Sequence, residues 1–209
     1  MLYNKSSKII SNDKKTKPYW QRFFSDFEGR ILDVGCGNGN FVSLDKENII
    51  GIDNDPDALK ACSDRGLNCL LMDVQKTLDF PDNTFDCVHA SQILEHLNNP
   101  VPLVKEFYRI LKPNGILIAA VPDAKKIGHQ FWDDYTHKRP YSRKSLREIV
   151  FDNGFRGIEI TPEPKSIRGA GYLCRREMIS PKFVNKLQDF LSFIGIRGNS
   201  LYVKCRKHV

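Results

Sequence analysis

Residues 31–39 have the sequence Ile-Leu-Asp-Val-Gly-Cys-Gly-Asn-Gly. The apolar start predicts a short buried strand, and the glycines predict a tight turn where the backbone can approach a ligand closely. A helix is expected after the turn, because the free N–H groups at a helix start attract anionic groups. The stretch therefore indicates a nucleotide-type site; the alternative is a strand-to-helix turn that binds nothing.

Two aspartates at the ends of the next predicted strands strengthen the first interpretation. Asp53 ends the strand at residues 49–53, where a carboxylate can accept hydrogen bonds from ribose hydroxyls. Asp73 ends the following strand and can accept from the exocyclic amine of an adenine. Either aspartate alone could be a helix cap. A dinucleotide fingerprint needs a small residue at the position of Asn40, so another adenosine-bearing cofactor fits as well.

Strand and helix patterns alternate on both sides of this stretch. Apolar runs predict strands at residues 49–53, 69–74, 85–90, 116–121, 157–161 and 199–206. Helices are expected to start near Tyr19, Asp55, Leu103, Ser145 and Ser180. This alternation predicts an α/β fold with a doubly wound, mainly parallel sheet.

Length and composition set the domain organisation. With 209 residues, 41% hydrophobic and 27% charged, the chain can form one globular domain. We expect a flexible N-terminal tail at residues 1–17 and a single domain at 18–209, in which residues 122–145 form a long loop over an acceptor site. Six cysteines without Cys-x-x-Cys spacing indicate buried free thiols and a cytoplasmic protein. The longest apolar run, residues 116–121, is too short for a transmembrane segment.

The net charge of +7 is unevenly distributed along the chain. Residues 1–30 carry +4, residues 31–120 carry −6 and residues 121–209 carry +9. A basic chain is typical of proteins that bind nucleic acid, anionic lipid or a phosphorylated substrate, although a solvated basic surface is the plain alternative. Because many of the basic residues fall in and after the long loop, they favour an anionic acceptor.

Several motifs in order resemble class I S-adenosylmethionine-dependent methyltransferases, and among them the small-molecule, type 11-like group. The motifs are residues 33–39, 51–53, 79–86, 95–97, 99–100 and 109–115. The resemblance covers roughly residues 25–160. It implies a Rossmann-like mixed sheet of seven strands with an antiparallel last strand, and S-adenosyl-L-methionine as the cofactor.

The resemblance also implies a set of cofactor-binding residues. The glycine turn would approach the methionine part through its backbone, and Asp33 would orient the methionine amino group. Asp53 would hold the ribose, Asn54 would flank the adenine, and Ser91 would lie near the methionine carboxylate and the methyl group. The full implied set is Asp33, Gly35, Cys36, Gly37, Asp53, Asn54, Asp73, Val74 and Ser91.

The sequence also offers candidates for a catalytic residue and bears on whether a metal is required. His137, in the long loop, is the predicted base or acceptor ligand; alternatively it braces the loop, and His96 is a weaker candidate. Some relatives hold a cation through a Glu-x-x-Glu-His pattern, but this chain has Gln92 at the first position. Because an amide replaces a negative ligand there, no metal is expected to be required.

These inferences predict a methyltransferase acting on an acidic small molecule or on a glycan or lipid precursor. An RNA methyltransferase is an alternative, although no added RNA-binding module is visible and nucleic acid is not the favoured partner. A non-catalytic regulatory protein that binds S-adenosylmethionine is the alternative from another class. The intact cofactor residues favour the enzyme.

Overall fold

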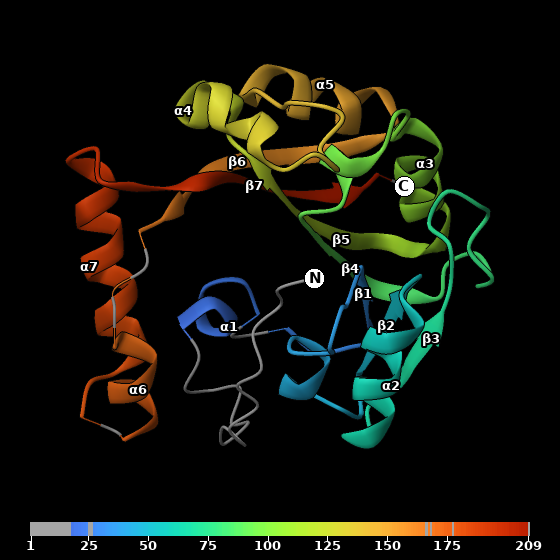
Figure 1. Cartoon of the computed structure of the whole chain (residues 1–209), viewed down its shortest axis with the longest axis horizontal. Coiled ribbons are helices and arrows are strands. Elements are labelled where there is room, and N and C mark those ends of the chain that lie inside the picture. Colours follow the sequence, from blue (N-terminus) through green and yellow to red (C-terminus); the bar gives the residue numbers. More distant parts are fainter. Residues whose placement is uncertain (1–17, 25–26, 166, 168, 177, 209) are drawn as a thin grey trace.

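The computed structural model describes residues 18–24, 27–165, 167, 169–176 and 178–208. The predicted tail, residues 1–17, lies outside these ranges. The described residues form a seven-stranded sheet with the order β3-β2-β1-β4-β5-β7-β6 (Figure 1). Its strands are β1 (Ile31–Val34), β2 (Ile49–Asp53), β3 (Cys69–Leu71), β4 (Phe85–Ser91), β5 (Leu111–Pro122), β6 (Phe155–Pro164) and β7 (Arg197–Lys207).

The direction of the strands agrees with the predicted fold class. The pairs β1–β2, β2–β3, β1–β4 and β4–β5 are parallel. β7 lies between β5 and β6 and runs antiparallel to both. The α/β fold with a mixed, seven-stranded sheet and an antiparallel last strand is therefore confirmed.

Helices cover both faces of the sheet, with α3 and α5 on one side and α1 and α2 on the other (Figure 1). The α-helices are α1 (Pro18–Phe23), α2 (Pro56–Asp64), α3 (Val101–Ile110), α4 (Ala124–Ile127), α5 (Arg143–Asp152), α6 (Ala170–Arg175) and α7 (Pro181–Phe193). Short 3-10 helices are η2 (Val42–Leu44), η3 (Leu94–His96) and η4 (Gly128–Asp133). Asp55 caps α2 by accepting from the Asp57 N–H at 2.9 Å, as the Asp-Pro-Asp start predicts.

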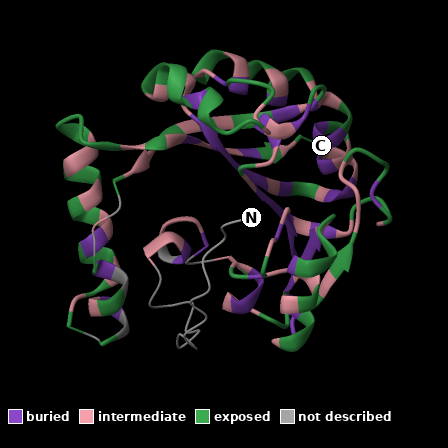
Figure 2. Cartoon of the chain, viewed as in Figure 1, coloured by how far each residue is buried: buried purple, intermediate pink, exposed green. Residues whose placement is uncertain are grey.

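The central strands are buried on both faces, which fixes the position of their ends (Figure 2). Leu32 and Val34 pack in one cluster with Phe107 of α3, whereas Ile31 packs in the other with Trp20 of α1. Since residues that face opposite sides of β1 belong to different clusters, a shift of one residue would place each side chain in the wrong cluster. The carboxyl end of β1, and the glycine turn after it, are thereby held in place.

The helix expected after the glycine turn is absent from the described residues. Residues 35–41 form successive turns and are followed only by η2. Glycine and asparagine are poor helix formers, and β2 already begins at Ile49, so little chain remains for a helix. The prediction of helical N–H groups at the site was therefore wrong.

Three other predictions of the elements need correction. β3 ends at Leu71 instead of residue 74, because it is an edge strand whose last side chain is 64% exposed. The expected loop at residues 122–145 contains α4, η4 and the first turn of α5. α5 begins at Arg143, because Ser142 caps it by accepting from the backbone N–H of Ser145 at 3.2 Å.

Candidate active site

The glycine turn is bonded to the neighbouring strand and leaves open space above it. The backbone N–H groups of Gly35 and Cys36 both donate to the Ile52 carbonyl, at 2.8 and 3.0 Å. Gly37 has a φ of +49°, which other L-residues rarely adopt. A Cβ added at Gly37 would meet no atom within 4 Å, so a ligand can approach this backbone closely.

Asp53 joins the second motif to the first. The Gly37 N–H donates to Asp53 Oδ2 at 2.8 Å, and the Asp55 N–H donates to Oδ1 at 3.0 Å. Each carboxylate oxygen has two lone pairs, so Asp53 can still accept from two hydroxyls of a ligand. Asn54 follows at the exposed start of the next loop. The structure thus brings the glycine turn and the predicted ribose residue into direct contact.

Asp73 and Val74 follow β3, next to the end of β2. The Met72 N–H donates to the Asp53 carbonyl at 2.9 Å and so holds the two strand ends together. Asp73 Oδ1 accepts from the Gln75 N–H at 2.9 Å, so this aspartate also shapes its own turn. Val74 is partly buried against the core.

Asp33 lies in a buried hydrogen-bonded chain that the sequence did not predict. Asp33 Oδ1 lies 2.7 Å from His89 Nδ1, and His89 Nε2 lies 2.9 Å from the Tyr19 hydroxyl. Because a carboxylate only accepts, Nδ1 carries the proton, so Nε2 accepts from Tyr19. This fixes the orientation of Asp33. The sequence signal was a histidine inside an apolar strand, at the position that pairs with Asp33.

Tyr19 supports a prediction on stability. In Tyr19→Phe, the buried Nε2 of His89 loses its donor, and we expect a loss of about 1–3 kcal/mol in the free energy of unfolding. Urea unfolding followed by circular dichroism measures this loss. Tyr135→Phe is the matched control, because the Tyr135 side chain is 95% exposed. Equal unfolding free energies for wild type and Tyr19→Phe would contradict the buried chain.

Ser91 ends β4 beside the glycine turn. Its neighbour Ala90 pairs with Val34, the last residue of β1. The next residues turn back sharply, with a φ of +58° at Gln92, and the side chain of Ile93 occupies the space that a Cβ at Gly35 would need. The segment after β4 is therefore packed against the turn, and Ser91 lies where the two meet.

His137 lies in a second group of polar side chains, on the segment after η4. Donor atoms of Glu95, His96 and His137 lie within 4.8 Å of one another. The His137 ring stacks on Phe131, with ring centroids 4.5 Å apart. Both alternatives for His137 therefore have support: it braces the loop, and it also faces two other ionisable groups. His96, the weaker candidate, belongs to the same group.

The hydrogen bonds of the two histidines determine where their protons are. His137 Nδ1 lies 2.7 Å from the Phe131 carbonyl, which only accepts, so Nδ1 carries the proton. Thr136 Oγ1 donates to Asp134 Oδ1 at 2.6 Å and lies 2.9 Å from His96 Nδ1, so it accepts from that nitrogen. Burial lowers the pKa of His96. In the neutral form, both histidines therefore keep a free lone pair on Nε2.

Glu95 is fully buried, and neither carboxyl oxygen has a hydrogen-bond partner among the described residues. Burial raises its pKa to about 8. A buried polar group without a partner is rare in folded proteins and needs an explanation. Two histidines with free Nε2 atoms beside a buried acid form a group suited to proton transfer.

Glu95 also predicts how stability depends on pH. Below pH 4.5 both the folded and the unfolded state hold its proton. Between pH 4.5 and about 8 only the folded state does, so its contribution falls as the pH rises. We expect this loss, on the order of 3–5 kcal/mol, to disappear in Glu95→Gln. Urea unfolding at pH 5 and pH 8 tests it. If the unfolding free energy of Glu95→Gln depended on pH as that of the wild type does, the assignment to Glu95 would be refuted. The same holds if the exposed control Glu148→Gln lost this pH dependence.

Several basic residues of the last third donate to backbone carbonyls. The guanidinium groups of Arg143 and Arg147 donate to the carbonyls of Ile160 and Ile158, on the edge strand β6. Lys126 donates to the Gly198 carbonyl at 2.6 Å. Arg139 likewise donates to the Asn98 carbonyl at 3.4 Å, whereas Lys125 and Lys138 lie exposed on the segment that carries His137.

The comparisons with known proteins agree with this fold. A family model described as a methyltransferase domain matches residues 32–119. The crystal structure of an S-adenosylmethionine-dependent methyltransferase from Archaeoglobus fulgidus superposes with a TM-score of 0.69, at 24% identity, over 90% of this chain and 91% of that one. An uncharacterised protein of Methanocaldococcus jannaschii is 28% identical over 64% of this chain and 68% of its own length.

Two named enzymes match a smaller share of their own length. Phosphoethanolamine N-methyltransferase 1 of Arabidopsis thaliana is 28% identical over 62% of this chain and 29% of the enzyme. Sterol 24-C-methyltransferase of Aspergillus fumigatus is 33% identical over 68% of this chain and 39% of the enzyme. The chain therefore spans less than half the length of these two relatives.

A mainly parallel sheet with one reversed strand, and a glycine turn bonded to an aspartate at the end of the next strand, are features of a doubly wound fold of the nucleotide-binding type. Residues 32–119 match the methyltransferase-domain family, and the fold is that of the class I S-adenosylmethionine-dependent methyltransferases. S-adenosyl-L-methionine is the cofactor of this class, and one structural neighbour was solved in complex with it. Among the described residues, no helix is long and apolar enough to cross a membrane.

Proposed function

We propose that this chain transfers the methyl group of S-adenosyl-L-methionine to an anionic small molecule, or to a glycan or lipid precursor, in the cytoplasm. The observation that carries the proposal is the bond between the Gly37 N–H and Asp53, which links the glycine turn to the ribose residue. The acceptor lies against residues 122–145, where His137 and the exposed lysines are found.

The residues at the strand ends fit the chemical parts of this cofactor. The open space at Gly37 accepts the methionine part, and Asp33, held by His89, orients the amino group. Asp53 accepts from the ribose hydroxyls, and the remaining oxygen of Asp73 accepts from the adenine amine. Bound there, the cofactor supplies an activated methyl group on a cationic sulfonium, which the acidic middle of the chain favours.

The chain contributes mainly alignment and a proton acceptor. A hydroxyl or amine acceptor must lose a proton before or during attack on the methyl group. The free Nε2 of His137 takes that proton, while the bond from Nδ1 to the Phe131 carbonyl keeps the ring in place. The neighbouring His96 and Glu95 are placed to carry the proton onward.

The positive charges on the segment that carries this base favour an anionic acceptor. Lys125, Lys138 and Arg139 are exposed on the segment between β5 and α5. The Arabidopsis relative is named for a phosphate-bearing amine, which supports the same sign of charge. Arg143 and Arg147 give less support than the sequence suggested, since both donate to backbone carbonyls of β6.

Thermal unfolding with added ligands tests the cofactor first. S-adenosylmethionine and its demethylated product should each raise Tm, as expected for about 2.7 kcal/mol of stabilisation at a concentration of 100 times Kd. NAD should leave Tm unchanged. A shift with NAD and none with the other two would refute the proposal.

Transfer of labelled methyl groups then tests the acceptor. Phosphorylated amines and phosphorylated sugars should be methylated, and their uncharged analogues should react more slowly. Labelling of RNA, with binding that weakens steeply as salt is added, would favour an RNA methyltransferase instead. Cofactor binding without methylation of any of these acceptors would favour the regulatory alternative.

A further inference from the structure

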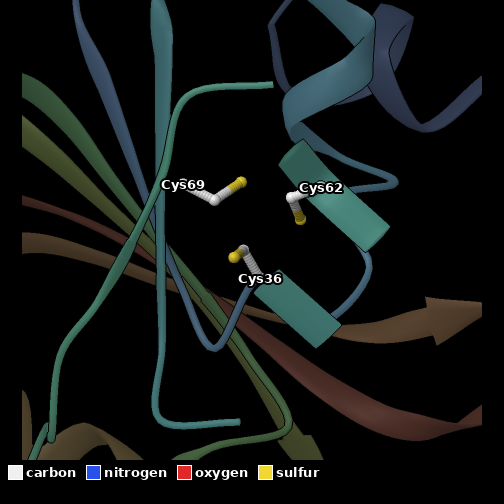
Figure 3. A group of neighbouring side chains, drawn as sticks. All are labelled: Cys36, Cys62 and Cys69. Atoms are coloured by element: carbon white, nitrogen blue, oxygen red, sulfur yellow. The ribbon is translucent and has the colours of Figure 1, made fainter. Parts of the chain in front are cut away.

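Three cysteines from separate elements lie together directly behind the glycine turn. Cys36 belongs to the turn, Cys62 to α2 and Cys69 to β3, and their sulfur atoms lie within 4.8 Å of one another. Figure 3 shows the three side chains pointing into a common space. The chain spacings of 26 and 7 residues match no metal motif, so the tertiary structure alone brings these thiols together.

Two glycines, which have no Cβ, provide the space that the three cysteine side chains occupy. A Cβ at Gly51 would lie 2.7 Å from the sulfur of Cys36 and 2.8 Å from that of Cys69. A Cβ at Gly39 would lie 2.8 Å from the sulfur of Cys62. All six cysteines are free thiols, but three of them converge here.

The distances match those of a thiolate metal site. Zn–S bonds of about 2.3 Å place the sulfurs of a tetrahedral or trigonal site roughly 3.8–4.0 Å apart. The three sulfurs, within 4.8 Å, therefore need to move by no more than about 1 Å, which small rotations of the side chains provide. Soft thiolate ligands favour zinc and related d10 cations over magnesium or calcium.

A fourth ligand is available in the turn itself. The Gly37 carbonyl lies 3.3 Å from the Cys62 sulfur and 3.7 Å from the Cys36 sulfur, as the acceptor of both thiols. When the thiols lose their protons, this oxygen is released from both bonds and remains close to two of the three sulfurs. A water molecule entering beside the half-buried Cys69 is the other source of a fourth ligand.

We propose that Cys36, Cys62 and Cys69 form a binding site for one thiophilic divalent cation, Zn²⁺ or Cd²⁺, behind the cofactor turn. Binding forms three metal–sulfur bonds and releases the three thiol protons to solvent, so the site carries one net negative charge. This proposal departs from the expectation that no metal is required, which rested on Gln92 at a different place in the fold.

The positive charge of Arg65 opposes the net negative charge of the metal-bound site. Burial raises the pKa of Cys62 to about 12, whereas the positive charge of Arg65 acts in the opposite direction. Arg65 lies at the end of α2 and donates to the Asn38 carbonyl in the turn. A cation that replaces the protons removes the cost of burying thiolates, and Arg65 offsets the remaining negative charge.

Titration of the reduced, metal-free protein with Cd²⁺ tests the site, because cadmium thiolates absorb in the ultraviolet. We expect a charge-transfer band that saturates at one Cd²⁺ per chain and disappears when Zn²⁺ displaces the probe. Cys62→Ala, Cys62→Ser and Cys69→Ala should each weaken binding by more than about 10-fold, since losing even an outer-shell partner costs 10–100-fold.

Cys205→Ala is the matched control, because Cys205 is equally buried but lies on β7, across the sheet. It should bind Cd²⁺ as wild type does. Cooperative unfolding of each variant, measured without metal, shows that the fold is retained. Absence of the band in the wild type, or wild-type affinity in folded Cys62→Ser and Cys69→Ala, would overturn the proposal.

Discussion

His137→Ala lowers kcat by about 10²- to 10⁴-fold, the usual contribution of a positioned general base. The reason is the geometry of the ring, which carries its proton on Nδ1 toward the Phe131 carbonyl and leaves the Nε2 lone pair for the acceptor. Steady-state methyl transfer to a phosphorylated acceptor measures the loss. The Kd of S-adenosylmethionine stays within twofold of wild type, because His137 lies outside the predicted cofactor residues.

His129→Ala is the control for this prediction. His129 belongs to η4 in the same segment, but its side chain is exposed. It should retain the kcat of wild type. An unchanged kcat in His137→Ala would refute the base. A loss of kcat in His137→Ala together with an equal loss in His129→Ala would show that the loop, rather than the Nε2 atom, is responsible.

Asp53→Ala weakens binding of S-adenosylmethionine by about 1–3 kcal/mol, or roughly 5- to 150-fold in Kd. The substitution removes the acceptor of the Gly37 N–H as well as the partner of the ribose hydroxyls. Isothermal titration with the demethylated product measures the affinity without turnover. Because the loss is in binding, kcat at saturating cofactor should change less than Kd.

Asp64→Ala is the control for the loss of one negative charge. Asp64 is exposed at the end of α2, so its removal changes the net charge by the same amount without touching the strand ends. Its affinity should equal that of wild type within twofold. Equal affinities for Asp53→Ala and wild type would rule out Asp53 as the ribose residue.

Local signals in the sequence were sufficient for most of the elements. The apolar runs identified the strands, and Asp55-Pro56 identified the start of α2, because these signals depend on neighbouring residues alone. They failed where the environment decided the outcome. After the glycine turn, the early start of β2 left little chain for the expected helix.

The candidate site also combines residues that the sequence identified with residues that it missed. The glycine turn, Asp53 and Asp73 were identified from the sequence, because each lies at the end of a predicted strand. Their roles toward the cofactor remain predictions. His89 and Tyr19 were missed, since nothing local connects residues 70 positions apart. Only their packing shows that His89 bonds Asp33 on one side and Tyr19 on the other.

The sequence by itself thus determined the class of fold, and it predicted the edge of the sheet at which the cofactor would bind. Both follow from strand order and from residues that lie a few positions apart. The tertiary structure decided which side chains meet across larger separations: Glu95 with His137, and Cys36 with Cys62 and Cys69. The physical reason is that burial, proton positions and metal-binding distances depend on neighbours in space.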